Sequence, residues 1–403
     1  MSGRLIILSI DMPYPPNYGH KVDQFHRWRG FAADGWKLRL ICWRSPQDPP
    51  AAPDSDAKLA SVFDRVDELP IGYDWRSMMR RLFLLPRYPS HVASRVPDAA
   101  TRRRLIAEAK AFAPDAIILD GIYGGVLGFA LARACAVPVI VRGHNIEHVY
   151  FSGQVRAASG LARKIKWTLA LLGLKRYETG ILRKADWTFD ISADDVRFWQ
   201  ERGINRISWS PTVYPGDDRA SLVDPAERTF DVAYIGNMRL PNNLAGLTWF
   251  VREVLPRLRA ARPETTYCFA GANPSPEAIR LFAEAPEITL VPDAPSADEI
   301  LKNGRVLVNP ILSGSGVNVK SIDMLRYDAP IVTTSIGAQG FDAAIRAQFT
   351  VADDEAGFAD AILAALADPH PPAGRTEARA LFGSAGLEAQ IALVSRVIAE
   401  AGS

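Results

Sequence analysis

Residues 306–334 contain the side chains most suited to holding a phosphorylated ligand. Their pattern predicts a buried strand, a glycine-rich turn at 313–316, a helix and a second strand. A helix that follows such a turn offers unpaired backbone N–H groups and partial positive charge to a phosphate. Lys320 adds a full charge in the first helical turn. Asp323 lies three residues later on the same face, where it can accept a hydrogen bond from a ligand hydroxyl.

A second polar cluster directly follows the apolar run at 137–141. Within six residues it places the cation of Arg142, the imidazole of His144 and the carboxylate of Glu147. Open α/β sheets bind their ligands at the carboxyl ends of strands, so this cluster is a candidate catalytic group. A polar loop with an internally bonded histidine is the structural alternative.

The elements that must position both clusters are repeated strand–loop–helix units, which indicate an α/β fold with doubly wound, Rossmann-like sheets. One series of such units begins with the strand at 5–10, and a second begins with the strand at 230–236. A length of 403 residues favours two domains. The region 208–228 contains proline and aspartate without periodicity, and we expect it to link the two domains.

Composition argues against several other classes of protein. A net charge of +2 argues against binding nucleic acid through bulk charge. The three cysteines are scattered, which favours buried thiols in a reducing compartment, and the six histidines form no metal-ligand cluster. The apolar run at the N-terminus is shorter than a signal peptide requires. The apolar run at 169–174 is far below the roughly 20 residues that span a bilayer. We therefore expect a cytoplasmic protein.

Two segments, 76–104 and 156–184, are strongly basic although the whole chain is nearly neutral. Each contains eight basic residues and a single acid, with apolar residues interleaved. This pattern suits an amphipathic face that rests on anionic lipid headgroups, so we expect a peripheral association with the inner face of the cytoplasmic membrane. A pair of solvated surface helices is the alternative.

The stretch 306–334 resembles the donor-sugar site of the GT-B glycosyltransferases, specifically the retaining glycosyl transferases of group 1, a family 4-like set that uses nucleotide-sugar donors. The spacing of Gly314, Gly316 and Lys320 matches an exopolysaccharide-type branch. The family's second glutamate, which holds the ribose, falls on Asp323, while the first falls on Ser315. The cluster at 142–147 recurs in this branch, where it faces the interdomain cleft.

This resemblance implies an N-terminal acceptor-binding domain at 1–208, a donor-binding domain at 209–375 and a C-terminal helix at 376–403 that crosses back to the first domain. It also assigns a glycine-containing loop beside the acceptor and the phosphates to Tyr18, Gly19 and His20, for which a surface loop with a structural glycine is the alternative. The catalytic residues it implies are His144, Arg142, Glu147 and Lys320. The donor-binding residues it implies are Gly236, Asn237, Arg239, Asn243, Pro292, Ser313, Gly314, Ser315, Gly316, Asn318, Val319, Lys320 and Asp323.

The function expected from these residues is the transfer of a sugar from a nucleotide-diphosphate donor to a lipid-linked or oligosaccharide acceptor, in cell-surface polysaccharide or glycolipid biosynthesis. We expect no metal and no other cofactor, with retention of configuration following from the resemblance alone. Two alternatives remain open: a nucleotide-sugar 2-epimerase of the same fold, and a non-catalytic domain that binds a glycan or a partner enzyme. The substitution of Ser315 for the first glutamate supports the second alternative.

Overall fold

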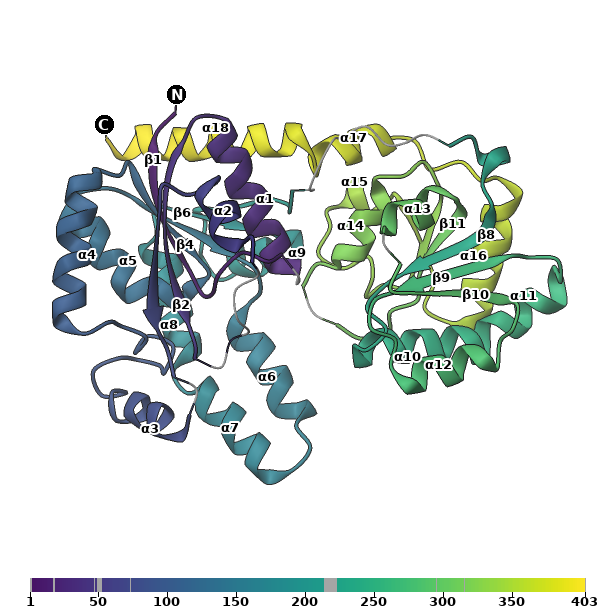
Figure 1. Cartoon of the computed structure of the whole chain (residues 1–403), viewed down its shortest axis with the longest axis horizontal. Coiled ribbons are helices and arrows are strands. Elements are labelled where there is room, and N and C mark those ends of the chain that lie inside the picture. The colour runs from purple at the N-terminus through teal and green to yellow at the C-terminus, as the bar shows by residue number, and fades with distance from the viewer. Residues whose placement is uncertain are drawn as a thin grey trace. The chain divides into compact units, whose positions relative to one another are not determined.

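The computed structural model describes residues 2–16, 19–46, 48, 53–72, 74–213, 223–294, 296–314 and 316–402. The chain divides into two compact units. The first contains Met1–Pro215 together with Ala385–Ser403, and the second contains Gly216–Ser384. Each unit is a parallel β-sheet covered by helices on both faces, as the sequence predicted (Figure 1).

The sheet of the first unit has seven strands in the order β3-β2-β1-β4-β5-β6-β7, all parallel to their neighbours. Its strands are β1 (Arg4–Ser9), β2 (Lys37–Arg44), β3 (Arg65–Pro70), β4 (Ala116–Asp120), β5 (Val139–Gly143), β6 (Trp187–Asp190) and β7 (Ile207–Trp209). Both faces are apolar: Ile6 and Leu8 point into one buried cluster, and Leu5 and Ile7 into another. A strand buried on both faces reads as a continuous apolar run, which is why β1 was recognisable in the sequence.

The helices of the first unit form two layers. Residues of α1 and the C-terminal helix α18 pack into one buried cluster, whereas those of α4, α5, α8 and α9 pack into the other (Figure 1). The helices are α1 (Gly19–Ala33), α2 (Ser55–Ala60), α3 (Trp75–Phe83), α4 (Ala99–Phe112), α5 (Gly125–Cys135), α6 (Glu147–Ala157), α7 (Leu161–Leu171), α8 (Leu174–Lys184), α9 (Ala193–Gln200) and α18 (Ser384–Ala401). Neither α3 nor α7 buries a single residue, and both project from the same end of this unit.

The sheet of the second unit has six strands in the order β10-β9-β8-β11-β12-β13, again all parallel. Its strands are β8 (Phe230–Ile235), β9 (Tyr267–Gly271), β10 (Ile288–Pro292), β11 (Gly304–Asn309), β12 (Ile331–Thr333) and β13 (Phe349–Val351). Its helices are α10 (Pro241–Trp249), α11 (Leu255–Ala261), α12 (Pro276–Ala283), α13 (Ala297–Lys302), α14 (Val319–Leu325), α15 (Ala343–Arg346), α16 (Glu355–Ala367) and α17 (Arg375–Leu381). A single π-helical segment, Phe250–Val254, joins α10 to α11.

The boundaries of the units lie at 215/216 and 384/385, whereas the sequence interpretation placed them after 208 and 375. The first difference arises because β7 is the last strand of the first sheet and extends to Trp209. The second arises because the predicted C-terminal helix at 376–403 is two helices. Helix α17 stays with the second unit, where the Arg375 guanidinium donates to the carbonyl oxygens of Tyr327 and Ala329.

Helix α18 packs on the first unit through Val394 and Val397, so the predicted return of the C-terminal helix is confirmed. Among the described residues, no single helix combines the length and apolar character needed to cross a membrane. Only α17 and α18 taken together, bent by 46°, satisfy those criteria.

Candidate active site

In the second unit, the loop between β11 and α14 is fastened at its base by a chain of buried hydrogen bonds. The Asn309 side-chain amide donates to the Ser321 hydroxyl at 2.9 Å, and that hydroxyl donates to the Gly337 carbonyl oxygen at 2.7 Å. A Cβ atom on Gly337 would lie 2.0 Å from the Thr333 hydroxyl oxygen, so only glycine fits there. These contacts hold the start of α14 at the carboxyl end of β11, where parallel sheets bind ligands.

Lys320 lies in the first turn of α14, and its ammonium group is bound by neutral partners. It donates to the Asn243 side-chain oxygen at 2.9 Å and to the Tyr234 hydroxyl at 3.3 Å, and it lies 4.9 Å from the centre of the Tyr234 ring. No carboxylate of the described residues pairs with it. Burial lowers the pKa of Lys320 from 10.5 to about 7. A cation kept without a counter-ion in the first turn of a helix is poised to receive an anion.

Asp323 lies one turn further along α14 and is partly buried. Burial raises the pKa of its carboxyl group to about 7, with Arg326 opposing the shift and Asp298 adding to it. Asp298 itself accepts hydrogen bonds from Arg326 and from the Tyr327 hydroxyl. No hydrogen bond within the described residues engages the Asp323 carboxylate, which leaves it able to accept one from a ligand hydroxyl.

The first turn of α10, which follows the loop after β8, supplies the partner of Lys320. Asn243 is buried, and its side-chain amide donates to the Asn237 carbonyl oxygen at 2.8 Å while its oxygen accepts from Lys320. The Asn243 side chain therefore bridges the loop before α10 and the first turn of α14. Arg239 is exposed on this loop, and its backbone N–H donates to the Asn237 side chain. Gly236 lies so close to Tyr234 that a Cβ atom would be 2.3 Å from its hydroxyl oxygen.

The remaining predicted donor residues lie along the same edge of the second sheet. Ser315 is the exception, because it lies outside the described residues. Gly316 has a positive φ of 71°, which favours glycine at this turn. Asn318 precedes the first residue of α14, but its side chain makes no capping hydrogen bond. The other residues of this set are exposed or partly buried: Pro292, Ser313, Gly314 and Val319.

In the first unit, His144 follows β5 and pairs with an aspartate that the sequence analysis did not select. Its Nε2 atom lies 2.6 Å from the Asp120 carboxylate at the end of β4. The second carboxylate oxygen of Asp120 accepts a hydrogen bond from the Trp28 indole at 3.3 Å. Although burial opposes ionisation, His144 keeps the pKa of Asp120 below its ordinary value. Asp120 therefore fixes the orientation of the imidazole, while His144 retains a small exposed fraction of 14%.

Arg142 is buried and its contacts are structural. Its guanidinium donates to the Asp23 carboxylate at 3.0 Å and to the Ser210 carbonyl oxygen at 2.7 Å. Asp23 also accepts from Arg27, and the two guanidinium groups hold its pKa well below the ordinary value in spite of burial. This cluster ties α1 and β5 to the segment that follows β7. The catalytic role predicted for Arg142 stays a prediction.

Glu147 begins α6 and lies in a network of buried acids. Its carboxylate accepts from the Tyr123 hydroxyl at 2.8 Å, and burial raises its pKa to about 7. The backbone N–H groups of Glu147 and His148 both donate to Glu178, which also contacts the His148 ring. Glu178 thus occupies the N-terminus of α6, where a negative charge is favourable.

The predicted acceptor loop is only partly described, because Tyr18 lies outside the described residues. Gly19 is the first residue of α1. The exposed His20 ring lies 3.3 Å from the Asp11 carboxylate, and Lys21 lies 3.5 Å from the same group. These contacts join the first turn of α1 to Asp11, which follows β1.

The structure thus brings Lys320 and Asn243 together in the second unit, and it places His144 near the end of β5 in the first. Two site residues were not predicted from the sequence: Asp120, which orients His144, and Glu178, which caps α6. Asp120 ends an apolar strand, and that position was a signal for it. Nothing in the local sequence marks Glu178 as a partner of α6. Within the described residues, no group of three or more histidine, cysteine or acidic side chains is placed to hold a metal ion.

The chain matches one family model and one curated relative. Residues 229–368, most of the second unit, match the family model described as Glycosyl transferases group 1. A relative from Klebsiella pneumoniae, described as an uncharacterized 44.6 kDa protein in the cps region, is 26% identical over 375 residues. That alignment covers 89% of this chain and 90% of the relative.

Solved structures share the fold over nearly the whole length of both chains. Anabaena Alr3699/HepE in complex with UDP superposes with a TM-score of 0.63 at 10% identity, covering 98% of this chain and 100% of that one. Sucrose-phosphate synthase from Thermosynechococcus elongatus superposes with a TM-score of 0.60 at 16% identity, covering 99% and 100%. At these identities the likeness establishes the fold.

Proposed function

We propose that this chain, which belongs to the glycosyl transferases of group 1 and has the GT-B fold, transfers a sugar from a nucleotide-diphosphate donor to a lipid-linked saccharide. The observation that carries the proposal is the ammonium group of Lys320, held by Asn243 and Tyr234 with no carboxylate of the described residues beside it. A charge in this setting is costly unless an anion joins it, because burial disfavours the ionised form. The diphosphate of a nucleotide sugar is such an anion.

The donor class is supported by two further features. Asp323 lies one helical turn from Lys320, which suits a carboxylate that accepts a hydrogen bond from a ribose hydroxyl while Lys320 contacts the phosphates. HepE, whose fold this chain shares, was solved in complex with UDP. A uridine nucleotide is therefore the first donor to test.

The reaction breaks the bond between the anomeric carbon and the diphosphate oxygen and forms a new bond to the acceptor oxygen. Negative charge builds on the leaving diphosphate, where Lys320 and Arg239 stabilise it. The acceptor proton leaves with the diphosphate on the same face of the sugar, which gives retention of configuration. Because these cations supply the positive charge that the diphosphate needs, transfer proceeds without a metal.

His144 acts from the first unit as the side chain that contacts the reacting sugar. The Asp120 carboxylate at 2.6 Å fixes its ring plane, and Trp28 fixes that carboxylate in turn. A pre-oriented imidazole costs little further ordering when the transition state forms.

The surface of the first unit supports the proposed acceptor and its location. Helix α3 exposes Trp75 and Phe83 by 70% and 78%, and α7 exposes Leu161 by 75%. Exposed large apolar side chains among many basic residues are typical of helices that lie in the headgroup region of a bilayer. The chain therefore works on the cytoplasmic face of the membrane, where lipid-linked saccharides are extended. The relative encoded in a cps region supports surface polysaccharide as the product.

Product analysis by mass spectrometry tests the proposal. Purified full-length protein is incubated with EDTA, a panel of nucleotide sugars and membrane extracts that contain lipid-linked saccharides. The expected result is a lipid-linked product heavier by one sugar, lost in the Lys320→Ala and His144→Ala variants. Isomerised donor without transfer would identify an epimerase instead, and absence of both transfer and nucleotide binding would leave a non-catalytic domain.

A further inference from the structure

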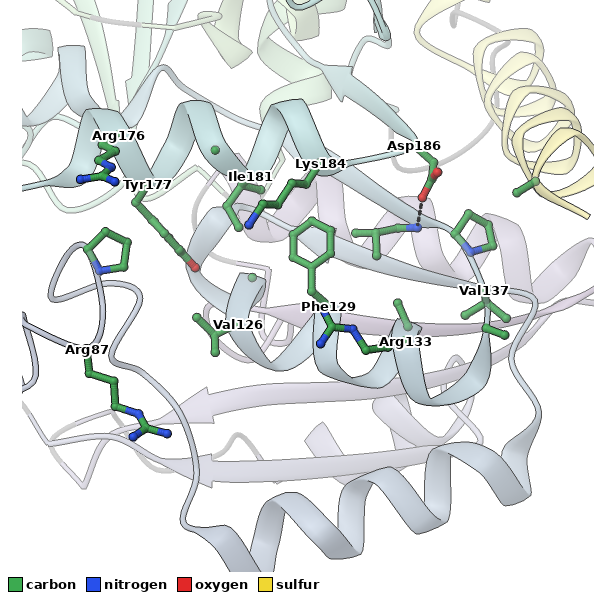
Figure 2. A pocket seen from close by; sticks show the side chains of 18 of the residues that line it. Arg87, Val126, Phe129, Arg133, Val137, Arg176, Tyr177, Ile181, Lys184 and Asp186 are labelled. Atoms are coloured by element: carbon green, nitrogen blue, oxygen red, sulfur yellow. Dashed lines mark hydrogen bonds between the residues drawn. The ribbon is translucent and has the colours of Figure 1, made fainter.

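A groove of about 990 Å³ lies between α5 and α8 of the first unit (Figure 2). Its floor is apolar and includes Val126, Phe129 and Ile181. Small residues deepen it: a Cβ atom added at Gly180 would meet nothing within 4 Å. The segment from Leu85 to Pro89 closes one end. None of the residues proposed above to contact donor or sugar lines this groove.

The rim of the groove is basic. Arg133 on α5, Arg176 and Lys184 on α8, and Arg87 in the closing segment all line it and are exposed. Among the described residues, none of these four cations forms an ion pair. Figure 2 shows Arg87 and Arg176 at the same end of the groove, whereas Asp186, the only acid among the described residues that line it, lies at the opposite end. The Asp186 carboxylate is also occupied, because it accepts the Val139 backbone N–H at 2.8 Å.

This combination selects for one kind of ligand. An apolar channel with a positive end and an opposite end that carries an acid matches an amphiphile with an anionic head and a hydrocarbon tail. The segment that closes the positive end follows directly after α3, whose Trp75 and Phe83 side chains are exposed. The positive end of the groove is therefore connected to the surface that we assign to the membrane.

We propose that the groove between α5 and α8 binds a phosphate-bearing membrane lipid, with its phosphate between Arg87 and Arg176 and a hydrocarbon chain along Phe129. The site goes beyond the proposed sugar transfer, since lipid binding needs neither donor nor reaction. Lipid binding in the groove and nucleotide binding in the second unit are therefore measured separately, and either can fail without the other.

A pair of matched glycine variants provides the central test. Gly180→Leu places a side chain in the groove, where the open space around Gly180 accommodates it without a clash. Gly153→Leu does the same on α6, where a Cβ atom would also meet nothing within 4 Å, but outside the groove. Both changes replace a helical glycine, so both should leave folding intact or improve it. Circular dichroism and the thermal midpoint verify this for each variant.

Calorimetric titration of the full chain with octyl phosphate and decyl phosphate, each below its micelle concentration, measures the binding. Each buried methylene contributes about fourfold in affinity, so decyl phosphate should bind about 15-fold more tightly than octyl phosphate, with one equivalent bound. Gly180→Leu should weaken decyl phosphate binding at least about tenfold, and Gly153→Leu should leave it unchanged. Undiminished binding in Gly180→Leu, or equal losses in the two variants, would overturn the proposal.

A second series tests the charge. Arg176→Glu should weaken decyl phosphate binding about tenfold or more, while decyl trimethylammonium should not bind the unaltered chain. Inorganic phosphate that binds as tightly as decyl phosphate would show an anion site without a lipid role. Tighter binding of an acidic amphipathic peptide than of decyl phosphate would assign the groove to a protein partner. Either result would refute the lipid assignment.

Discussion

Replacing Lys320 with methionine should stabilise the protein without nucleotide and weaken its binding of a nucleoside diphosphate. The two effects have opposite signs because the same ammonium group is costly in the empty site and favourable beside an anion. Methionine keeps the length and apolar stem of the side chain and removes only the charge. The substitution therefore separates a binding role for Lys320 from a structural one.

The size of the stability effect follows from the pKa. A decrease from 10.5 to about 7 corresponds to about 5 kcal/mol of unfavourable free energy for the charged form in the folded state. Methionine leaves the Asn243 side-chain oxygen without its donor, which costs about 1–3 kcal/mol. The net gain in the free energy of unfolding at pH 7 is therefore about 2–4 kcal/mol.

The gain should depend on pH in a defined direction. Because the folded pKa of Lys320 lies below the unfolded pKa, the unfolded chain binds more protons between pH 7 and 10.5, so this group makes the unaltered chain more stable as pH rises. The advantage of the methionine variant should be fully present below pH 7 and should shrink toward pH 10. Urea unfolding at pH 6, 7.5 and 9 measures it.

Nucleotide affinity should change in the opposite sense. Loss of a charge-assisted hydrogen bond costs about 1.5–3 kcal/mol, which is about 10- to 150-fold in the dissociation constant, measured by calorimetry with the nucleoside diphosphate that binds best. Lys302→Met serves as the control, because Lys302 is a lysine of the same unit that pairs with Glu299. A Lys320→Met variant that is less stable than the unaltered chain and binds nucleotide equally well would show that Lys320 has a structural role and does not bind the diphosphate.

Three further outcomes follow from the same geometry. The unaltered chain should bind the nucleotide sugar more tightly than Lys320→Met, and this advantage should fall about tenfold from pH 6 to pH 8 because Lys320 loses its proton near pH 7. Calorimetry of both proteins at each pH measures it. Asp120→Asn should lower kcat for transfer about 100-fold in initial-rate assays, since it leaves His144 without its orienting carboxylate, with the donor KM changed by less than about threefold. Gly337→Ala should destabilise the chain by about 2–3 kcal/mol in urea unfolding, because its Cβ would clash with Thr333.

The fold was predictable because strands buried on both faces leave long apolar runs in the sequence. The run at 306–310 became β11, and the run at 230–236 became β8. The glycine-rich turn before Lys320 was predictable for a similar reason, since the turn and the start of α14 are encoded within a few residues. Local patterns of this kind need no knowledge of which strands are neighbours.

The contacts that define the site depend on distant residues, and sequence patterns do not encode them. Lys320 meets Asn243 across 77 positions, and His144 meets Asp120 across 24. The burial of Arg142 could not be predicted from its local sequence, because its partner Asp23 lies 119 positions earlier. Each of these pairings follows from the strand order of its sheet, which places helices and loops together only once the chain is folded.

The most direct test of the donor site is the thermal midpoint of the full-length protein with UDP, GDP, TDP or CMP, each added alone in the presence of EDTA. A nucleotide at about 100 times its dissociation constant should stabilise the chain by about 2.7 kcal/mol. We expect a clear upward shift with one nucleotide, and we expect that shift to disappear in Lys320→Ala and Asp323→Ala. A midpoint unmoved by all four nucleotides would contradict the assignment of a nucleotide-sugar site to α14.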